Sequence, residues 1–319
     1  VGGPGMKNAH QLALHGVLVI FGALTLLPFF FVLNNSFRTN SELFHTFFGP
    51  PAALGDMAES LKALATGNDD LLLVLTSDGE EKAVPPAEAL GHAWLTATKG
   101  YRLAWEVLRG YMINTFIVCG VTAFGVVLLA SVSAYLLSRY RFIGHRVIFY
   151  YIISTMMFPG VLTFVPSYML VKDLGLLNTY WAMILPYVAG GQVFATFVFK
   201  SFFDGLPEEL FESARIDGAG HTQIYLNIVA PLSKPVLSVV VIMTTFGAWN
   251  NFLWPFVTNS DGRLHVIASG LFVMATSAYA QNYSTLFAAY MVASLPLLLI
   301  FIYATKPFIE GVASGAFKA

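Results

Sequence analysis

One short charged segment stands out in this chain. Residues 212–219 read ESARIDGA, and residues 228–231 read IVAP. Long apolar stretches flank this segment, whereas the segment itself carries acidic and basic side chains. Because charged side chains are costly inside a bilayer, the segment is expected to lie in water against another surface. The sequence therefore predicts a membrane protein with one dedicated docking element.

The composition agrees with a membrane protein. Of the 319 residues, 56% are hydrophobic and 11% are charged, whereas soluble domains carry about 25% charged residues. The net charge of −1 gives no sign of nucleic-acid binding. A single cysteine, Cys119, excludes an intrachain disulfide, and no Cys/His metal spacing occurs. Residues 1–5, ahead of Met6, are expected to be a leftover of cloning.

Six apolar stretches approach or exceed the roughly 20 residues that a membrane-spanning helix needs. They are residues 11–33, 112–137, 147–170, 180–200, 236–257 and 286–305. The first is interpreted as an anchor helix rather than a cleaved signal peptide, because it is long and lacks a small-residue cleavage site. The predicted fold is an all-α polytopic membrane protein with six transmembrane helices.

The distribution of Lys and Arg predicts the orientation, since short cytoplasmic loops are rich in them. With the N-terminus inside, two basic residues fall in short outer loops, Lys172 and Arg263. The inner segments then hold nine, namely Lys7, Arg139, Arg141, Arg146, Lys200, Arg215, Lys234, Lys306 and Lys318. Both termini and residues 204–232 are therefore expected in the cytoplasm.

Two spans are expected to be irregular. Residues 157–160 read MFPG in the third span, and residues 190–192 read GGQ in the fourth. Freed backbone groups inside a membrane need neighbouring protein or a water-lined cavity. These interruptions indicate either a translocation pathway or ordinary kinks at helix contacts, and both interpretations stay open.

Residues 34–110 are predicted to form a small extracytoplasmic subdomain between the first two spans. Helical spacing occurs at 57–64 and 87–95, and a strand at 71–76 precedes a tight turn. The subdomain is either a contact surface for a delivery protein or a family-specific addition.

The segment from 204 to 232 predicts a helix, a turn and a second helix. Pro207 suits the first helical position, and Gly218 suits a left-handed residue after the helix end. Leu206, Leu210 and Ala214 are expected on one face, with Phe211 beside them. The second helix is expected from about 221 to 229, ending near Pro231.

The spacing E-x-A-x3-G-x9-I-x2-P in this segment resembles the EAA loop of the membrane subunits of bacterial ABC importers. That pattern reads E-A-A-x3-G-x9-I-x-L-P, with Ser213 and Ala230 as departures here. Residues 249–255 (WNNFLWP) resemble the W-N-E/D-F-L-W-P motif of carbohydrate permeases, with Asn251 where an acid is usual. Residues 307–318 are similar to the tail of MalG-like subunits.

The resemblance implies a type I ABC importer permease core over 111–319. Its implied partners are two ABC ATPase subunits, a MalF-like permease subunit, a solute-binding protein and membrane lipid. ATP and Mg would be bound by the ATPase subunits, with no cofactor or metal in this chain. The implied ATPase contacts are Phe211, Glu212, Ala214, Arg215, Asp217 and Gly218, together with Gly315 and Lys318 of the tail at 306–319.

Residues suited to contacting a hydroxyl-rich solute on the pathway are polar or aromatic. The candidates are Thr163, Gln192, Trp249, Asn250 and Asn251, and hydrogen bonding between helices is the alternative role for each amide or hydroxyl.

The predicted function is inward transport of a sugar, oligosaccharide or related polar solute. An ion-coupled secondary transporter is the alternative, although the span interiors carry no ionisable group that such transporters use. An enzyme is disfavoured, since no HExxH, GxSxG or phosphate-binding loop occurs.

Overall fold

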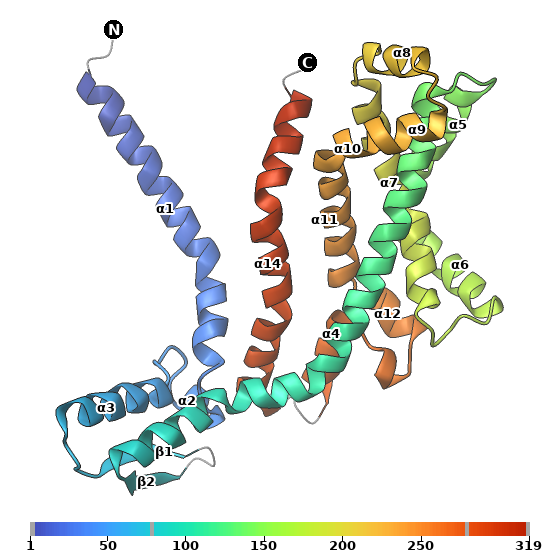
Figure 1. Ribbon diagram of the computed structural model, residues 1–319. Helices are drawn as coiled ribbons and strands as arrows, with labels where there is room; N and C mark the ends of the chain where they lie inside the picture. The colour runs from blue at the N-terminus through green and yellow to red at the C-terminus, as the bar shows by residue number, and fades with distance from the viewer. Residues whose placement is uncertain (1–3, 77–79, 278–280, 317–319) are drawn as a thin grey trace. The chain divides into compact units, whose positions relative to one another are not determined.

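The computed structural model describes residues 4–76, 80–277 and 281–316. The chain divides into two compact units. The first unit comprises Val1–Leu108 and Val273–Ser294, and the second comprises Arg109–Phe272 and Leu295–Ala319. Two long helices, α4 (Pro86–Arg139) and α14 (Tyr283–Ala316), contribute residues to both units (Figure 1).

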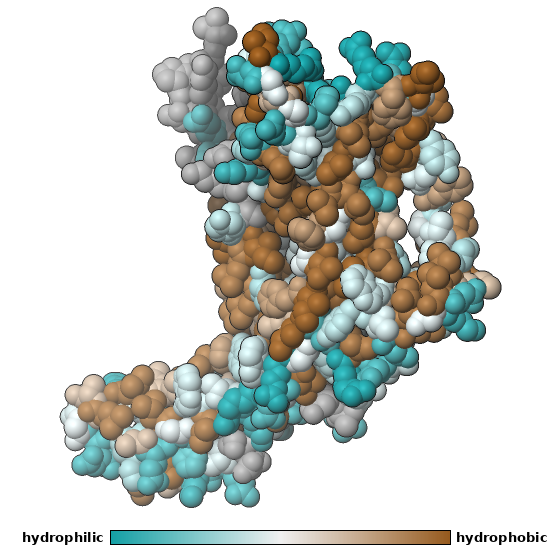
Figure 2. All heavy atoms as spheres, turned by 45° about the vertical axis from the view of Figure 1, so that its right-hand side comes forward, coloured by the Kyte–Doolittle hydropathy of each residue, from teal (hydrophilic) through white to brown (hydrophobic). Residues whose placement is uncertain are grey.

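Four helices in the described part of the chain are long and apolar enough to cross a membrane. These are α1 (Pro4–Asn35), α4, α7 (Trp181–Asp204) and α14. Two further spans are possible if each of two bent helix pairs counts as one, which brings the number to six. The chain is thus a helical polytopic membrane protein. Hydrophobic side chains cover much of the visible flank of the second unit (Figure 2).

The first unit contains the only sheet of the described residues. Besides α1 and the first part of α14, this unit includes α2 (Asn40–His45), α3 (Ala52–Thr66), the strands β1 (Leu72–Leu75) and β2 (Glu81–Val84), and the first part of α4. The strands pair antiparallel, with Leu72 opposite Val84. Val74 and Val84 are buried against Ala89 of α4. The predicted helix at 57–64 and strand at 71–76 are confirmed. The intervening residues 77–79 lie outside the described part.

In the second unit, α5 (His145–Ser154) and the 3₁₀ turn at Thr155–Met157 meet α6 (Gly160–Asp173) at a bend of 100°. The bend falls at Phe158 and Pro159, which have extended backbone. The predicted break of the third span is therefore confirmed. The break agrees with the preference of the residue before a proline for extended over helical backbone.

The prediction of a break in the fourth span is wrong, because α7 is helical throughout, including Gly190 and Gly191. A Cβ atom on Gly191 would meet Cγ2 of Val126 at 3.0 Å. This glycine therefore allows close packing of α7 on α4 rather than interrupting the helix.

Two other expectations need correction, and one helix was not expected. The helix expected at 87–95 is not separate, since α4 runs unbroken for 54 residues into the second span. The fifth span is not continuous to residue 257, because α11 (Lys234–Asn250) ends before α12 (Leu253–Thr258). At this break, the side-chain oxygen of Asn251 accepts a hydrogen bond from the Trp254 backbone N–H at 3.2 Å. A short helix, α13 (Ile267–Thr276), was not predicted.

Candidate functional site

The charged segment folds into a compact helical element, which we call the coupling segment (residues 204–232). It contains α8 (Glu209–Ile216), α9 (His221–Ile224), a π-helical turn at Tyr225–Val229 and α10 (Ala230–Leu232). After α10 the chain bends by 75° into α11. The coupling segment therefore leads directly into a helix of the membrane core.

Gly218 forms the turn between α8 and α9. Its φ of +80° lies in the left-handed region, which disfavours any residue with a side chain. Its N–H donates to the carbonyl of Arg215 at 3.0 Å, and the N–H of Ala219 donates to the carbonyl of Ala214 at 2.9 Å. These bonds satisfy carbonyls at the end of α8, as the sequence predicts.

One face of α8 is buried in the core of the second unit. Phe211 is 1% exposed and Ala214 is 8% exposed, and both join a cluster that includes Phe199 and Phe203 of α7. Leu210, predicted on the same face as Ala214, is 38% exposed. Phe211 and Ala214 thus hold the coupling segment to its own chain rather than presenting a free surface.

An arginine at the end of α4, whose side chain is 9% exposed, holds α8 in place. The guanidinium of Arg139 lies 3.7 Å from the ring centroid of Phe211 and 2.6 Å from a carboxylate oxygen of Glu208. It also donates to the backbone carbonyl of Leu206 at 3.2 Å. Arg215 pairs with the same carboxylate at 3.2 Å. A cation over an aromatic face and a charge-assisted hydrogen bond both gain strength where water is scarce.

Hydrogen bonds to α4 hold the second half of the coupling segment. The hydroxyl of Tyr135 lies 3.2 Å from Nδ1 of His221, and Ser131 Oγ lies 2.7 Å from the hydroxyl of Tyr225. The ring of Tyr140 packs on His221 with centroids 4.1 Å apart. Movement of α9 must therefore displace α4 or break these contacts.

The outer face of the coupling segment is exposed and mixes charge with one apolar side chain. Glu212, Arg215, Asp217 and Gly218 are all exposed. Ile216 is 85% exposed, although it lies between two charged residues. The sequence analysis missed Ile216. Its signal was an apolar residue at a position that helical spacing assigns to the polar face. This arrangement suits contact with a partner surface that has an apolar pocket with charged edges.

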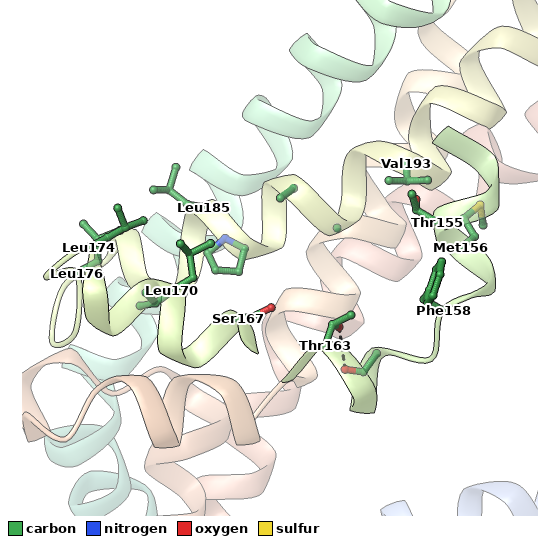
Figure 3. Close-up of a pocket in the computed structure, with 15 residues that line it drawn as sticks. Thr155, Met156, Phe158, Thr163, Ser167, Leu170, Leu174, Leu176, Leu185 and Val193 are labelled. Atoms are coloured by element: carbon green, nitrogen blue, oxygen red, sulfur yellow. Dashed lines mark hydrogen bonds between the residues drawn. The ribbon is translucent and has the colours of Figure 1, made fainter. Parts of the chain in front are cut away.

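Thr163 lines a cavity of about 610 Å³ between α6 and α7. Figure 3 shows Thr163 and Ser167 on α6, with apolar side chains of both helices around them. The Thr163 hydroxyl donates to the carbonyl of Gly160 at 3.0 Å. A second cavity, of about 400 Å³, is lined by Asn251.

The other pathway candidates lie in different surroundings. Trp249 is 3% exposed and packs edge-on against Phe116. The Asn250 amide donates to the carbonyl of Phe246 at 2.9 Å, and Gln192 is half-buried on α7. The second cavity is also lined by Thr122 and Tyr187, whose buried hydroxyls have no hydrogen-bond partner in the described structure. The sequence analysis missed both residues.

Gly315 of the tail lies in the last turns of α14, while Lys318 lies outside the described residues. Among the described residues, no group of three or more His, Cys, Asp or Glu side chains could hold a metal ion.

The comparisons with known proteins cover most of this chain. Residues 126–306, more than half of the chain, match the family described as binding-protein-dependent transport system inner membrane component. The diacetylchitobiose uptake system permease protein NgcG of Streptomyces coelicolor is 30% identical over 95% of this chain and 88% of its own length. The arabinooligosaccharides transport system permease protein AraQ of Bacillus subtilis is 34% identical over 59% of this chain and 66% of its own.

One solved structure resembles the fold along nearly the whole chain. It is the crystal structure of a bacterial ABC transporter involved in the import of the acidic polysaccharide alginate, with a TM-score of 0.69 and 17% identity. The match covers 96% of this chain and 99% of the other. On the sequence match and the shared helical fold, this chain belongs to the family of binding-protein-dependent transport system inner membrane components.

Proposed function

We propose that this chain is the permease subunit of an ATP-driven importer that moves a sugar, oligosaccharide or related polar solute into the cell. The observation that carries the proposal is the coupling segment, which is tied to α4 by Arg139 and Tyr135 and exposes Ile216 among charges. The solute class follows the names of the relatives, which take up diacetylchitobiose and arabinooligosaccharides.

The proposal includes partners that supply what this chain lacks. Two ABC ATPase subunits would bind ATP and Mg, and a MalF-like permease subunit would complete the pathway. A solute-binding protein would deliver the solute on the outside. Both termini and the coupling segment then lie in the cytoplasm, at the inner membrane of a bacterium. The tail residues Gly315 and Lys318 would contact the ATPase as well.

Coupling in this proposal is mechanical. ATP binding would favour one arrangement of the ATPase subunits through differential contacts with Glu212, Arg215, Ile216, Asp217 and Gly218. Because Phe211 is buried beneath the guanidinium of Arg139, α8 is expected to move together with the end of α4. Phe211 and Ala214 would then transmit the movement from inside the chain.

The pathway in this proposal passes the two cavities of the second unit. Thr163 and Asn251 are kept as solute contacts because they line these cavities. Gln192 and Asn250 would contribute at most an amide group at the edge of the pathway. Trp249 would shape the wall of the pathway through its packing on Phe116.

The test is uptake in the complete transporter. Ile216→Asp and Glu212→Lys each change an exposed side chain of α8, so both variants are expected to assemble in the membrane and to lose most solute uptake. Solute-stimulated ATPase activity should fall with it. Gly218→Pro should have the same effect, because it removes a donor and excludes the positive φ.

The matched control is Glu106→Lys, which makes the same charge change at an exposed position of the first unit. It should leave uptake unchanged. Normal uptake and ATPase activity in all three coupling-segment variants would contradict the proposal. Uptake that follows an ion gradient, without ATP or a binding protein, would favour a secondary transporter instead.

A further inference from the structure

A polar cavity of about 350 Å³ lies where α4 ends and α5 begins, and the proposed transport mechanism does not use it. Three cationic side chains line it, namely Arg141, Arg146 and Lys200, together with His145 and the aromatic ring of Tyr150. The residues come from the end of α4, from α5 and from α7, all within the second unit.

The positive charge of this cavity is only partly balanced. Lys200 Nζ lies 2.6 Å from a carboxylate oxygen of Asp204 and 4.9 Å from the ring centroid of Phe149. The other oxygen of Asp204 accepts from Ser138 at 2.6 Å. Arg141 and Arg146 are exposed and form no ion pair with a described residue. Two guanidinium groups therefore remain to bind an anion from outside the chain.

The surface next to the cavity is apolar and aromatic. Ile143 is fully exposed, and on α5 Val147 is 71%, Tyr150 69% and Tyr151 72% exposed. Long apolar side chains on a membrane helix lie against lipid tails, and tyrosines gather at the level of lipid headgroups. The unpaired arginines thus lie where a membrane-facing helix meets the polar boundary.

We propose that this cavity binds the headgroup of an anionic phospholipid of the cytoplasmic leaflet, with its acyl chains along the exposed face of α5. Guanidinium groups bind phosphate oxygens in pairs of parallel hydrogen bonds. Basic pockets between transmembrane helices on the cytoplasmic side are suited to phospholipid headgroups. The leaflet assignment rests on the orientation given under the proposed function.

An acidic surface of a protein partner fits the same charge less well. The coupling segment presents acidic and basic side chains together, as a protein contact does, whereas Arg141 and Arg146 present one sign beside an apolar face. A lipid satisfies both halves of this surface at once, because it carries its anionic group and its apolar chains in one molecule.

Lipid binding to the full chain, purified with its partner subunits and stripped of native lipid, tests the proposal. Phosphatidylglycerol and phosphatidylcholine with identical acyl chains are titrated, and retained lipid is counted by native mass spectrometry. We expect phosphatidylglycerol to bind at least about tenfold more tightly. Arg141→Gln with Arg146→Gln should weaken phosphatidylglycerol by roughly ten- to thirtyfold and leave phosphatidylcholine unchanged.

Two further variants keep the result interpretable. Arg141→Lys with Arg146→Lys retains the charge, so it should keep the preference for phosphatidylglycerol with reduced affinity. Arg102→Gln with Arg109→Gln removes two exposed arginines from the earlier part of α4 and should change nothing. If the glutamine variant does not fold, the test rests on whether the wild-type chain binds phosphatidylglycerol more tightly than phosphatidylcholine.

Three results would overturn the inference. One is equal binding of the two lipids by the wild-type chain. A second is displacement of phosphatidylglycerol by millimolar inorganic phosphate, which would identify a site for a soluble anion. The third is loss of the ATPase subunits in the glutamine variant with lipid binding intact, which would identify a protein contact. Failure of ATP-driven uptake would leave the lipid titration unaffected and would count against the proposed function only.

Discussion

Leu210 and Phe211 of α8 differ in burial, because Phe211 lies under the guanidinium of Arg139 and in the core of the second unit. Helical spacing places Leu210 on one face with Ala214 and puts Phe211 beside that face, and in the structure Phe211 is 1% exposed and Leu210 38%. Spacing gives only relative positions around a helix. The face that turns inward is set by contacts with Arg139 and with the phenylalanines of α7. Arg139 lies more than 60 residues before α8 in the sequence, so spacing within α8 does not reveal this contact. Gly218 could be predicted, because its backbone requirement is local.

Truncation of Phe211 should therefore destabilise the protein much more than truncation of Leu210. Phe211→Ala leaves a cavity under the guanidinium of Arg139 and is expected to cost about 3–5 kcal/mol of unfolding free energy. Leu210→Ala, at the next position of the same helix, should cost less than about 1 kcal/mol. Thermal unfolding of the full chain in detergent compares the two, and a larger loss for Leu210→Ala would contradict the described packing.

At the scale of elements, breaks are predictable where the backbone decides and unpredictable where packing decides. The third span breaks at Phe158 and Pro159, where the residue before the proline is extended, the conformation that proline favours for its predecessor. Gly191 leaves α7 intact, because its missing Cβ admits Val126 of α4. The break at Asn251 depends on a side-chain hydrogen bond to Trp254, which no periodicity reveals. The unbroken α4 could not be foreseen, since its polar first part and apolar second part look like separate elements.

A half-buried carboxylate of α3 holds the β-hairpin of the first unit. Asp56 accepts a hydrogen bond from the Leu75 N–H at 3.2 Å. Burial raises the pKa of Asp56 above 3.8; the hydrogen bond from Leu75 opposes this, and Glu42 and Glu59 add to the rise. The folded unit therefore binds this proton more tightly than the unfolded chain does. Its stability falls as pH rises from about 3.8 through the raised pKa.

Asp56→Asn should relieve this penalty, because the amide oxygen can still accept from Leu75 without carrying charge. The amides of β1 and β2 are expected to exchange hydrogen more slowly at neutral pH in the variant. The difference should shrink near pH 4, where the wild-type carboxyl takes up its proton. Exchange rates are corrected for their intrinsic pH dependence. Asp69→Asn, at an exposed position of the same unit, is the control, and equal effects of the two substitutions would exclude the role of Asp56.

At the scale of the whole molecule, the helical membrane class is predictable and the division into units is not. The described residues contain four helices long enough to span a membrane, or up to six spans if each of two bent helix pairs counts as one. The boundary between the units falls inside α4, near Leu108 and Arg109, with no linker sequence to mark it. The match to NgcG over 95% of this chain runs through most of residues 34–110. That region is therefore shared with at least one relative rather than peculiar to this chain.

The continuity of α4 through both units should matter for transport, because the coupling segment is tied to its far end at Arg139. Gly110 lies next to the unit boundary, and a Cβ atom there would meet nothing within 4 Å. Gly110→Ala should therefore keep uptake and gain about 0.5–1 kcal/mol of stability.

Gly110→Pro places a ring in the helix interior, at a cost of about 3 kcal/mol or more, and kinks the helix. It should reduce uptake strongly while the ATPase subunits remain bound. Full uptake in the proline variant, with the kink verified by cross-linking between cysteines placed on either side of residue 110, would show that transport does not need a continuous α4.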